Sequence, residues 1–257
     1  MKKLFLSVAL IVCIAFTGCL DTVEELTINS NGAGTYKTTM DMSGLFDMLQ
    51  MVAAMDTSSD QKLKSFTEKD FDSTIRLGSF ADTAADLSAE QKKLFKDAEV
   101  RITIKQSERK FALSMNFPFT KPEQVEELMK LSGGGKALGM LGKKMTGENI
   151  TENESTDALP SPTAVFDMQF ASGLLERKLN DTKLAALKNN DQFKKMAEAK
   201  DAMGSMSFKT VIHLPSPVKK LTGEKALLSA DKKTVTISST LINVFENPAA
   251  LAYRIEY

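Results

Sequence analysis

Short segments in which apolar and polar residues alternate recur along the chain and predict β-strands. Leu26 and Ile28 belong to the first segment, and beyond Asn31-Gly32 a second one continues to Met42. An Asn-Gly pair between two such segments is a strong hairpin signal, because both residues accept the positive φ angles of a two-residue turn. Further alternating positions are Val100, Ile102 and Ile104; Phe111, Leu113, Met115, Phe117 and Phe119; Phe166, Met168 and Phe170; Phe208, Thr210, Ile212 and Leu214; Val235 and Ile237; and Leu251, Tyr253 and Ile255.

Between these segments the apolar residues change to the spacing of helices. They are Leu45, Met48, Leu49, Val52 and Met55; Leu94 and Phe95; Val125, Leu128 and Met129; Leu184 and Leu187; and Phe193 and Met196. Ser88 with Gln91 has the spacing of a capping box, and Thr120 with Glu123 repeats it with Pro122 in the first turn. Hairpins with helices between them predict an α+β fold, an antiparallel β-sheet built from hairpins and covered by helices.

The stretch 132–162 follows neither period. Six glycines lie between positions 133 and 147, a polar run covers 148–157, and Pro160 and Pro162 follow. Such compositions form loops and linkers, so we expect a mobile loop here. The loop either separates two lobes or is an insertion in one domain. Because the hairpins on both sides are alike, we favour a single domain over 22–257 with one sheet.

The N-terminus has the composition of an export signal. Lys2 and Lys3 precede an apolar run over 4–16 that only Ser7 interrupts. This run is too short for a bilayer core, which needs about 20 residues, and fits the apolar region of a signal peptide. It leads into Phe16-Thr17-Gly18-Cys19, which resembles the bacterial lipobox, where the cysteine is acylated and the preceding peptide bond is cut. Phe16 stands where that motif usually has an aliphatic residue.

The sequence therefore predicts a signal peptide over 1–18 and a lipidated N-terminus over 19–21, with palmitate-type chains on Cys19. Secretion with an unmodified Cys19 is the alternative. The only other cysteine, Cys13, lies in the segment to be removed. A lone thiol in an exported protein needs a role, and acylation supplies one.

Two or more acyl chains anchor a protein durably, and no apolar run of 18 residues follows Cys19, so we expect a domain tethered to the bacterial cell envelope. Leu20 is not the Asp that retains lipoproteins in the inner membrane in enterobacterial-type sorting. This favours the outer membrane where the cell has one.

Composition excludes several classes of function. The 257 residues hold 33 Lys+Arg and 33 Asp+Glu, so the chain lacks the basic excess of a nucleic-acid binder. Ala137 and Lys144 break a Walker-type loop, and Leu138 breaks a dinucleotide fingerprint. We therefore expect no nucleic-acid partner and no cofactor.

Metal sites are equally poorly supported. Asp70 and Asp72 begin like a calcium loop, but Ile75 replaces its turn glycine and Ala81 its final Glu. We expect surface carboxylates on a helix edge instead. His213 is the only histidine and Cys19 is assigned to lipid, so the chain cannot build a zinc site from these residue types.

Catalysis by a nucleophile would need His213 as its base. Strand parity places His213 on the face opposite Ile212, so we expect a solvated or edge-strand histidine. A glycosidase built on carboxylates needs no signature spacing and stays open, although three Tyr and no Trp argue against a sugar site. The expected protein is not an enzyme.

Methionine is the one unusual component. Met40, Met42, Met48, Met51 and Met55 cluster, and Met140 and Met145 lie in the glycine-rich loop. Flexible thioether side chains suit irregular cores and adaptable apolar binding surfaces, and core filling is favoured for the first cluster. For Leu138, Met140, Leu141 and Met145, flanked by Lys136, Lys143 and Lys144, a segment that touches a membrane or gates a ligand is the alternative.

Both ends of the mature chain resemble LppM-type bacterial lipoprotein domains. The residues concerned are Leu214-Pro215-Ser216-Pro217-Val218, Gly223 and the hairpin over 228–235, and, at the start, Leu26-Thr27-Ile28, Asn31-Gly32 and Ser43-Gly44-Leu45. Ser216 stands where the family commonly has Gly, and the middle of the chain, 47–209, departs from the family pattern. The resemblance implies a membrane-anchored α+β domain that binds lipid or glycolipid, and it carries over no catalytic residue.

Three functions follow. The first is a non-catalytic binding or structural module, whose partner is the membrane through the acyl chains on Cys19. The second is a carrier or sensor of lipid or another apolar ligand. An enzyme of unidentified class is the third. The sequence indicates no protein partner.

Overall fold

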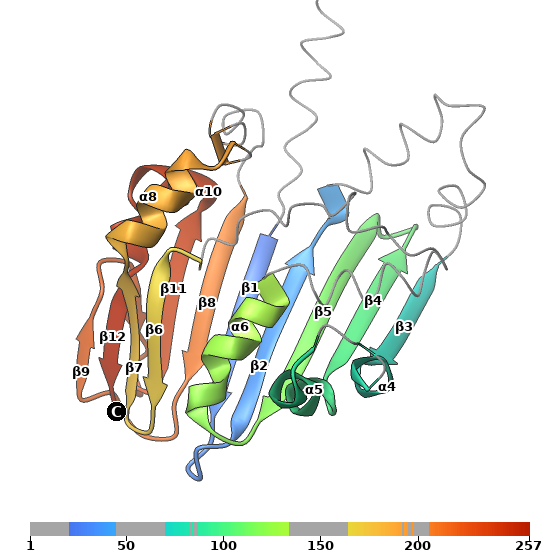
Figure 1. The fold of residues 1–257 in the computed structure, drawn as a ribbon, viewed down its shortest axis with the longest axis horizontal. Helices are drawn as coiled ribbons and strands as arrows, with labels where there is room; N and C mark the ends of the chain where they lie inside the picture. Colours follow the sequence, from blue (N-terminus) through green and yellow to red (C-terminus); the bar gives the residue numbers. More distant parts are fainter. Residues whose placement is uncertain are drawn as a thin grey trace, which may run out of the picture.

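A computed structural model of the chain describes residues 21–44, 70–82, 84, 87–133, 164–191, 193, 194, 197 and 206–257 (Figure 1). The expected signal peptide, Cys19, the helix expected over 45–55 and positions 134–162 of the expected loop lie outside these residues.

The described strands form two sheets (Figure 1). The larger has the order β10-β11-β8-β1-β2-β5-β4-β3 and the smaller β6-β7-β12-β9. The bounds are β1 Asp21–Ile28, β2 Gly34–Asp41, β3 Phe71–Arg76, β4 Glu99–Lys105, β5 Lys110–Phe119, β6 Phe166–Ala171, β7 Leu174–Leu179, β8 Ser207–His213, β9 Lys220–Thr222, β10 Ala226–Leu228, β11 Thr234–Thr240 and β12 Tyr253–Glu256. Among these strands β1 and β8 pair in parallel, and the other pairs are antiparallel.

Alternation puts one face of the eight-stranded sheet into the core. Leu26 lies opposite Tyr36, and Tyr36 opposite Phe117, and all three are buried. Their sequence neighbours on the other face, such as Lys37, are exposed or half-buried. This is the pattern of an antiparallel sheet with one packed face and one solvated face.

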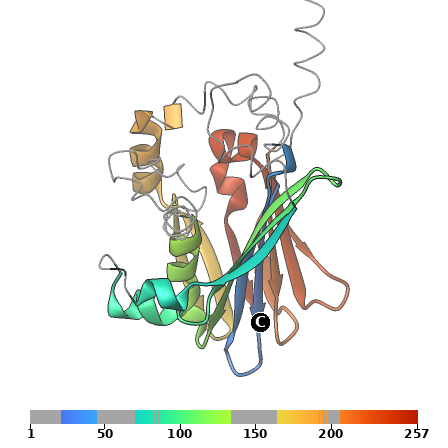
Figure 2. The ribbon, with the colours of Figure 1, turned by 90° about the vertical axis from the view of Figure 1, so that its right-hand side faces the viewer.

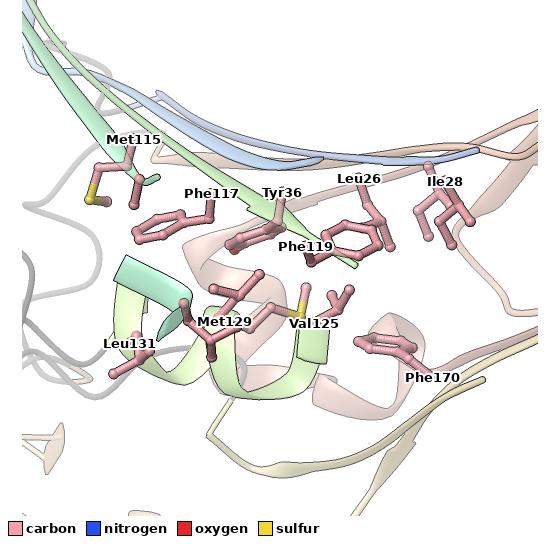
Figure 3. Close-up of a cluster of buried hydrophobic side chains, with 14 of the residues drawn as sticks. Leu26, Ile28, Tyr36, Met115, Phe117, Phe119, Val125, Met129, Leu131 and Phe170 are labelled. Carbon is pink, nitrogen blue, oxygen red and sulfur yellow. The ribbon is translucent and has the colours of Figure 1, made fainter. Parts of the chain in front are cut away.

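The helices lie on the packed side of this sheet (Figure 2). They are α4 Gly78–Ala81, α5 Ala89–Phe95, α6 Val125–Gly133, α8 Asp181–Asn189 and α10 Leu241–Glu246, with 3₁₀ turns η1 Pro122–Gln124 and η3 Pro248–Leu251. In α6, Val125 and Met129 face the aromatic side chains of the sheet, with Phe170 of the smaller sheet beside them, and buried Leu131 lies on the other side of the helix (Figure 3). One core therefore joins the helices to both sheets.

Two capping signals have different outcomes. Ser88 and Gln91 form the expected capping box at the start of α5. At the second site Gln124 takes the place expected for Glu123, because its side-chain oxygen accepts from the backbone N–H groups of Thr120 (2.8 Å) and Lys121 (3.1 Å). The 3₁₀ turn over 122–124 brings this side chain back to the start of the helix.

The α+β class built on hairpins and covered by helices is confirmed, but the expectation of one sheet is wrong. Strand β7, which the alternation did not reveal, forms a hairpin with β6 and then pairs with C-terminal β12. Alternation marks a strand without naming its partner, so it could not separate the sheets. Ser132 and Gly133, the first positions of the expected loop, belong to α6, and Ser132 is buried.

A substitution of Gly34 would test how closely the backbones of β1 and β2 pack at the hairpin. A Cβ atom at this position would lie 1.9 Å from the carbonyl oxygen of Thr27 and 2.6 Å from the Phe119 ring. We expect Gly34→Ala to lower the free energy of unfolding by about 2 kcal/mol or more, because backbone must move to relieve the clash. Urea unfolding would measure it, with exposed Lys37→Ala on the same strand as control. Equal stability of the two variants would contradict the described hairpin.

Candidate functional site

A row of polar side chains crosses the packed face of the eight-stranded sheet. Glu24 on β1 lies opposite Thr38 on β2 and Thr210 on β8. Thr38 and Thr210 are buried and Glu24 is half-buried. The next row on the same face is apolar and contains Leu26 and Ile212. Buried polar groups cost free energy unless they are hydrogen-bonded, so this row needs a structural or functional reason.

Glu24 is the centre of a hydrogen-bond network. Its Oε1 accepts from the hydroxyl of Tyr36 (3.1 Å) and its Oε2 from the hydroxyl of Thr210 (3.2 Å). The Ser132 hydroxyl of α6 donates to the carbonyl oxygen of Met129 (3.1 Å) and lies 3.4 Å from Tyr36 Oη. The network thus joins β1, β2, β8 and α6.

The smaller sheet contributes a buried cation. Arg177 on β7 is 5% exposed, and its Nε donates to the carbonyl oxygen of Leu251 at 3.0 Å. Its guanidinium lies 4.8 Å from the ring centroid of Phe166 and 5.3 Å from that of its cross-strand partner Tyr253. The aromatic faces and the carbonyl stabilise a charge that would otherwise be costly to bury.

Two buried hydroxyl oxygens, Thr38 Oγ1 and Tyr253 Oη, have no hydrogen-bond partner among the described residues. Burial raises the pKa of Tyr253 to about 12, although the positive charge of Arg177 acts in the opposite direction. Burial also raises the pKa of Tyr36 well above its ordinary value, and the negative charge of Glu24 adds to the effect. Both phenols are therefore protonated at neutral pH, and the Tyr36 hydroxyl donates to Glu24.

We call Glu24, Tyr36, Thr38, Thr210, Arg177 and Tyr253 the inner polar cluster. Partly buried Met40, Met42 and Met168 pack against the same core. Unfilled polar groups beside flexible apolar side chains suit a ligand that is mainly apolar and has a polar group, or an ordered water molecule.

Met40 and Met42 pack against the core, in agreement with the expectation of core filling, whereas Met48, Met51, Met55, Met140 and Met145 lie outside the described residues.

His213 lies on the solvated face, as parity predicts, but not on an edge strand, because β8 runs between β11 and β1. Its Nε2 is 3.1 Å from Glu25 Oε1, and its Nδ1 is 3.3 Å from Thr234 Oγ1. The side chains of His213 and Glu25 are 40% and 42% exposed. These partners come from β1 and β11, so only the strand order could bring the three side chains together.

Asp70 and Asp72 lie at strand β3 and not on the helix edge that was expected. Arg101 donates to both carboxylate oxygens of Asp72, at 2.8 and 2.7 Å, and this hydrogen bonding lowers the pKa of Asp72. Asp70 accepts from the backbone N–H of Gln106 at 2.9 Å. In the described part of the chain, no three or more His, Cys, Asp or Glu side chains gather to hold a metal ion.

A surface hollow of about 340 Å³ separates α5 from α6. It is lined by Ser88, Glu90, Gln91, Glu123, Glu126, Glu127 and Lys130. Lys130 pairs with Glu126 at 2.8 Å, and Gln91 Nε2 donates to Glu127 at 2.8 Å. Some of the charged groups that line the hollow are therefore already paired with other groups of the chain.

Comparisons with known proteins give little further guidance. No family model and no curated protein matches the chain. The chain has a weak structural similarity to the NMR structure of the folded domain of LppM from Mycobacterium tuberculosis. The TM-score is 0.32 and the identity 10%, over 93% of this chain and 90% of that one. At this level the similarity assigns neither a family nor a function.

The two buried tyrosines should respond in opposite ways to loss of their hydroxyl groups. In the ligand-free mature chain, Tyr253→Phe removes an unpaired buried hydroxyl and should raise the free energy of unfolding by about 1–3 kcal/mol. Tyr36→Phe removes a donor to the Glu24 carboxylate and should lower it by about 1.5–3 kcal/mol. Chemical denaturation at pH 7 would measure both. A destabilising Tyr253→Phe would show that this hydroxyl has a partner.

Tyr253 should also make the free energy of unfolding depend on pH in the alkaline range. The folded-state pKa of Tyr253 is about 12 against an ordinary 10.0, so its contribution to stability is complete below pH 10 and is lost as the pH rises towards 12. The stability of Tyr253→Phe relative to the unsubstituted chain should therefore increase over this range, by on the order of 2–3 kcal/mol. A difference that stays constant with pH would contradict the buried, protonated phenol.

Proposed function

We propose that the chain is a lipoprotein of the bacterial cell envelope, anchored through acyl chains on Cys19 and acting as a non-catalytic binding or structural module. The single observation that carries the proposal is the order of Lys2-Lys3, the apolar run 4–16 and Thr17-Gly18-Cys19 at the start of the chain. Leu20 after the cysteine supports the outer membrane as its location where the cell has one.

The described fold is compatible with this processing. Strand β1 begins at Asp21, so removal of residues 1–18 deletes none of the described elements. Every helix in the described part of the chain is too short or too polar to span a bilayer. Attachment to a membrane would then depend on the N-terminus.

Three observations favour a module without catalysis. The inner polar cluster has its charges bonded to the protein's own groups, as Glu24 and Arg177 show. The Thr234–His213–Glu25 arrangement lies on the solvated face of a sheet and links three neighbouring strands. Of the two acids in the calcium-like pattern, Asp72 is bound by Arg101 and Asp70 accepts from the backbone N–H of Gln106.

Cys19→Ala should leave the signal peptide attached and the N-terminus without acyl chains, because acylation precedes cleavage at a lipobox. Cys13→Ala is the matched control, since this thiol lies within the removed segment, and it should fractionate like the unsubstituted chain. Membrane fractionation and mass analysis of the N-terminal peptide would measure both. A bare thiol on Cys19 in native material would refute the anchor.

A second candidate function is a carrier or sensor of lipid or another apolar ligand. The observation that favours it is the inner polar cluster, where Thr38 and Tyr253 hold unpaired hydroxyls near partly buried methionines. A ligand with an apolar body and a polar group beside either hydroxyl would satisfy that hydroxyl and remove its desolvation cost.

Native mass spectrometry would test this candidate. The chain would be exported with a signal peptide that lacks the acylated cysteine and purified from the cell envelope. We expect a co-purifying lipid, and about fivefold less of it on Tyr253→Phe, because one hydrogen bond contributes about 1 kcal/mol. Leu227→Ala, an exposed position on β10, is the control. Ligand-free protein in repeated preparations would exclude the carrier and leave the lipoprotein anchor untouched.

A further inference from the structure

The end of the eight-stranded sheet at which β1 begins carries two exposed apolar side chains. Phe71, the first residue of β3, is 40% exposed, and Ile242 of α10 is 38% exposed. The register places both at the level of Asp21. Helix α10 follows Thr240, which lies opposite Ser207, and Ser207 lies opposite Asp21. These segments form the upper end of the sheet in Figure 1.

The register of the remaining strands places Phe71 at the same end of the sheet. It lies opposite Ile104 of β4, which lies opposite Phe111 of β5. The next residue of β5, Ala112, pairs with Asp41, and Asp41 pairs with Asp21. In the strand order, β1 stands two strands from β11 and four from β3. Neighbouring strands are about 4.8 Å apart. The start of β1 is therefore roughly 10 Å from β11, which is followed by the helix of Ile242, and roughly 19 Å from β3, which carries Phe71.

The proposed anchor is very close to this end. Cys19 precedes Asp21 by two residues, which span at most about 7 Å. The headgroup layer on each side of a bilayer is roughly 5–8 Å thick, from a core of about 30 Å and a total of 40–45 Å. A chain held by acyl chains on Cys19 therefore keeps the start of β1 within the headgroup layer or at its outer boundary.

The carboxylates at this end are already bonded within the chain. Asp21 accepts from the hydroxyl of Ser207, Asp41 from the backbone N–H of Ser43 at 2.9 Å, and Asp70 from that of Gln106. In the β4–β5 turn, Lys105 pairs with Glu108 at 2.9 Å. The same turn also carries the exposed basic residues Arg109 and Lys110, so an apolar contact through Phe71 and Ile242 would lie beside basic side chains.

We propose that this end of the sheet, through Phe71 and Ile242, rests on the bilayer surface to which Cys19 holds the chain. The β1–β2 turn around Asn31 then lies at the far end of β1, away from the membrane. The inference rests on the proposed anchoring through Cys19, because the short tether selects which end of the domain meets the lipid. A tether also raises the effective concentration of the two side chains at the surface, so that weak apolar contacts suffice.

Single tryptophan reporters can test this orientation, since the chain has no Trp. The mature chain, residues 19–257, contains Cys19 as its only thiol, which can be coupled to a maleimide lipid in phosphatidylcholine vesicles. Reporters would be Phe71→Trp and Ile242→Trp, with Leu227→Trp on edge strand β10 and Asn31→Trp in the far turn as controls. Brominated phosphatidylcholine quenches those indoles that enter the interface.

We expect Phe71→Trp and Ile242→Trp to be quenched about twofold more than both controls, because interfacial apolar side chains lie roughly 5–10 Å into the headgroup and acyl boundary. Circular dichroism would show that each variant is folded. Equal quenching of all four reporters, or none at Phe71→Trp or Ile242→Trp, would overturn the proposal.

The chemical tether keeps this test separate from the proposed function. Coupling through maleimide places Cys19 at a membrane whether or not a cell acylates it. Failure of the reporters would therefore refute the orientation alone, whereas a bare thiol on Cys19 in native material would refute the anchor.

Discussion

The pairing of β1 with strands from both ends of the chain is the constraint on which the eight-stranded sheet depends. β1 lies between β2, which follows it directly, and β8, which begins nearly two hundred residues later. Without β1, the order separates into β10-β11-β8 and β2-β5-β4-β3. The parallel pair with β8 is thus the long-range contact that makes one packed face from two hairpin systems. Such non-local pairing must overcome a large loop-closure entropy before its contacts form.

The position of β1 also explains why the inner polar cluster can exist. Glu24 lies in the middle of the sheet, where donors reach it from both neighbours, Tyr36 on β2 and Thr210 on β8. The four-stranded sheet then brings Arg177 and Tyr253 to the same core, and the aromatic rings stabilise the guanidinium. A half-buried carboxylate and a buried guanidinium are tolerated here because each has hydrogen-bond partners. The hydroxyls of Thr38 and Tyr253, which have no partner within the described part of the chain, are the exception, and they make this core a candidate binding site.

The two proposals about the membrane depend on the same strand. An anchor on Cys19 would lie two residues before β1, which is an inner strand of the larger sheet. A module held in this way presents one end of its sheet to lipid and the opposite turns to the surrounding space. That geometry suits a protein that works at the membrane surface, as a structural element or by exchanging an apolar ligand with the bilayer.

Local patterns in the sequence were sufficient for the elements whose cause is local. The alternation around Leu26, Phe117 and Ile212 predicted strands and their buried faces, and Ser88 with Gln91 predicted a helix start, because periodicity and capping involve neighbours in the chain. Only the tertiary structure decided that there are two sheets, that β1 pairs in parallel with β8, and that His213 meets Glu25 and Thr234. It alone brought Glu24, Arg177 and Tyr253 into one core. Strand partners are chosen by contacts between residues far apart in the chain, and alternation carries no record of that choice.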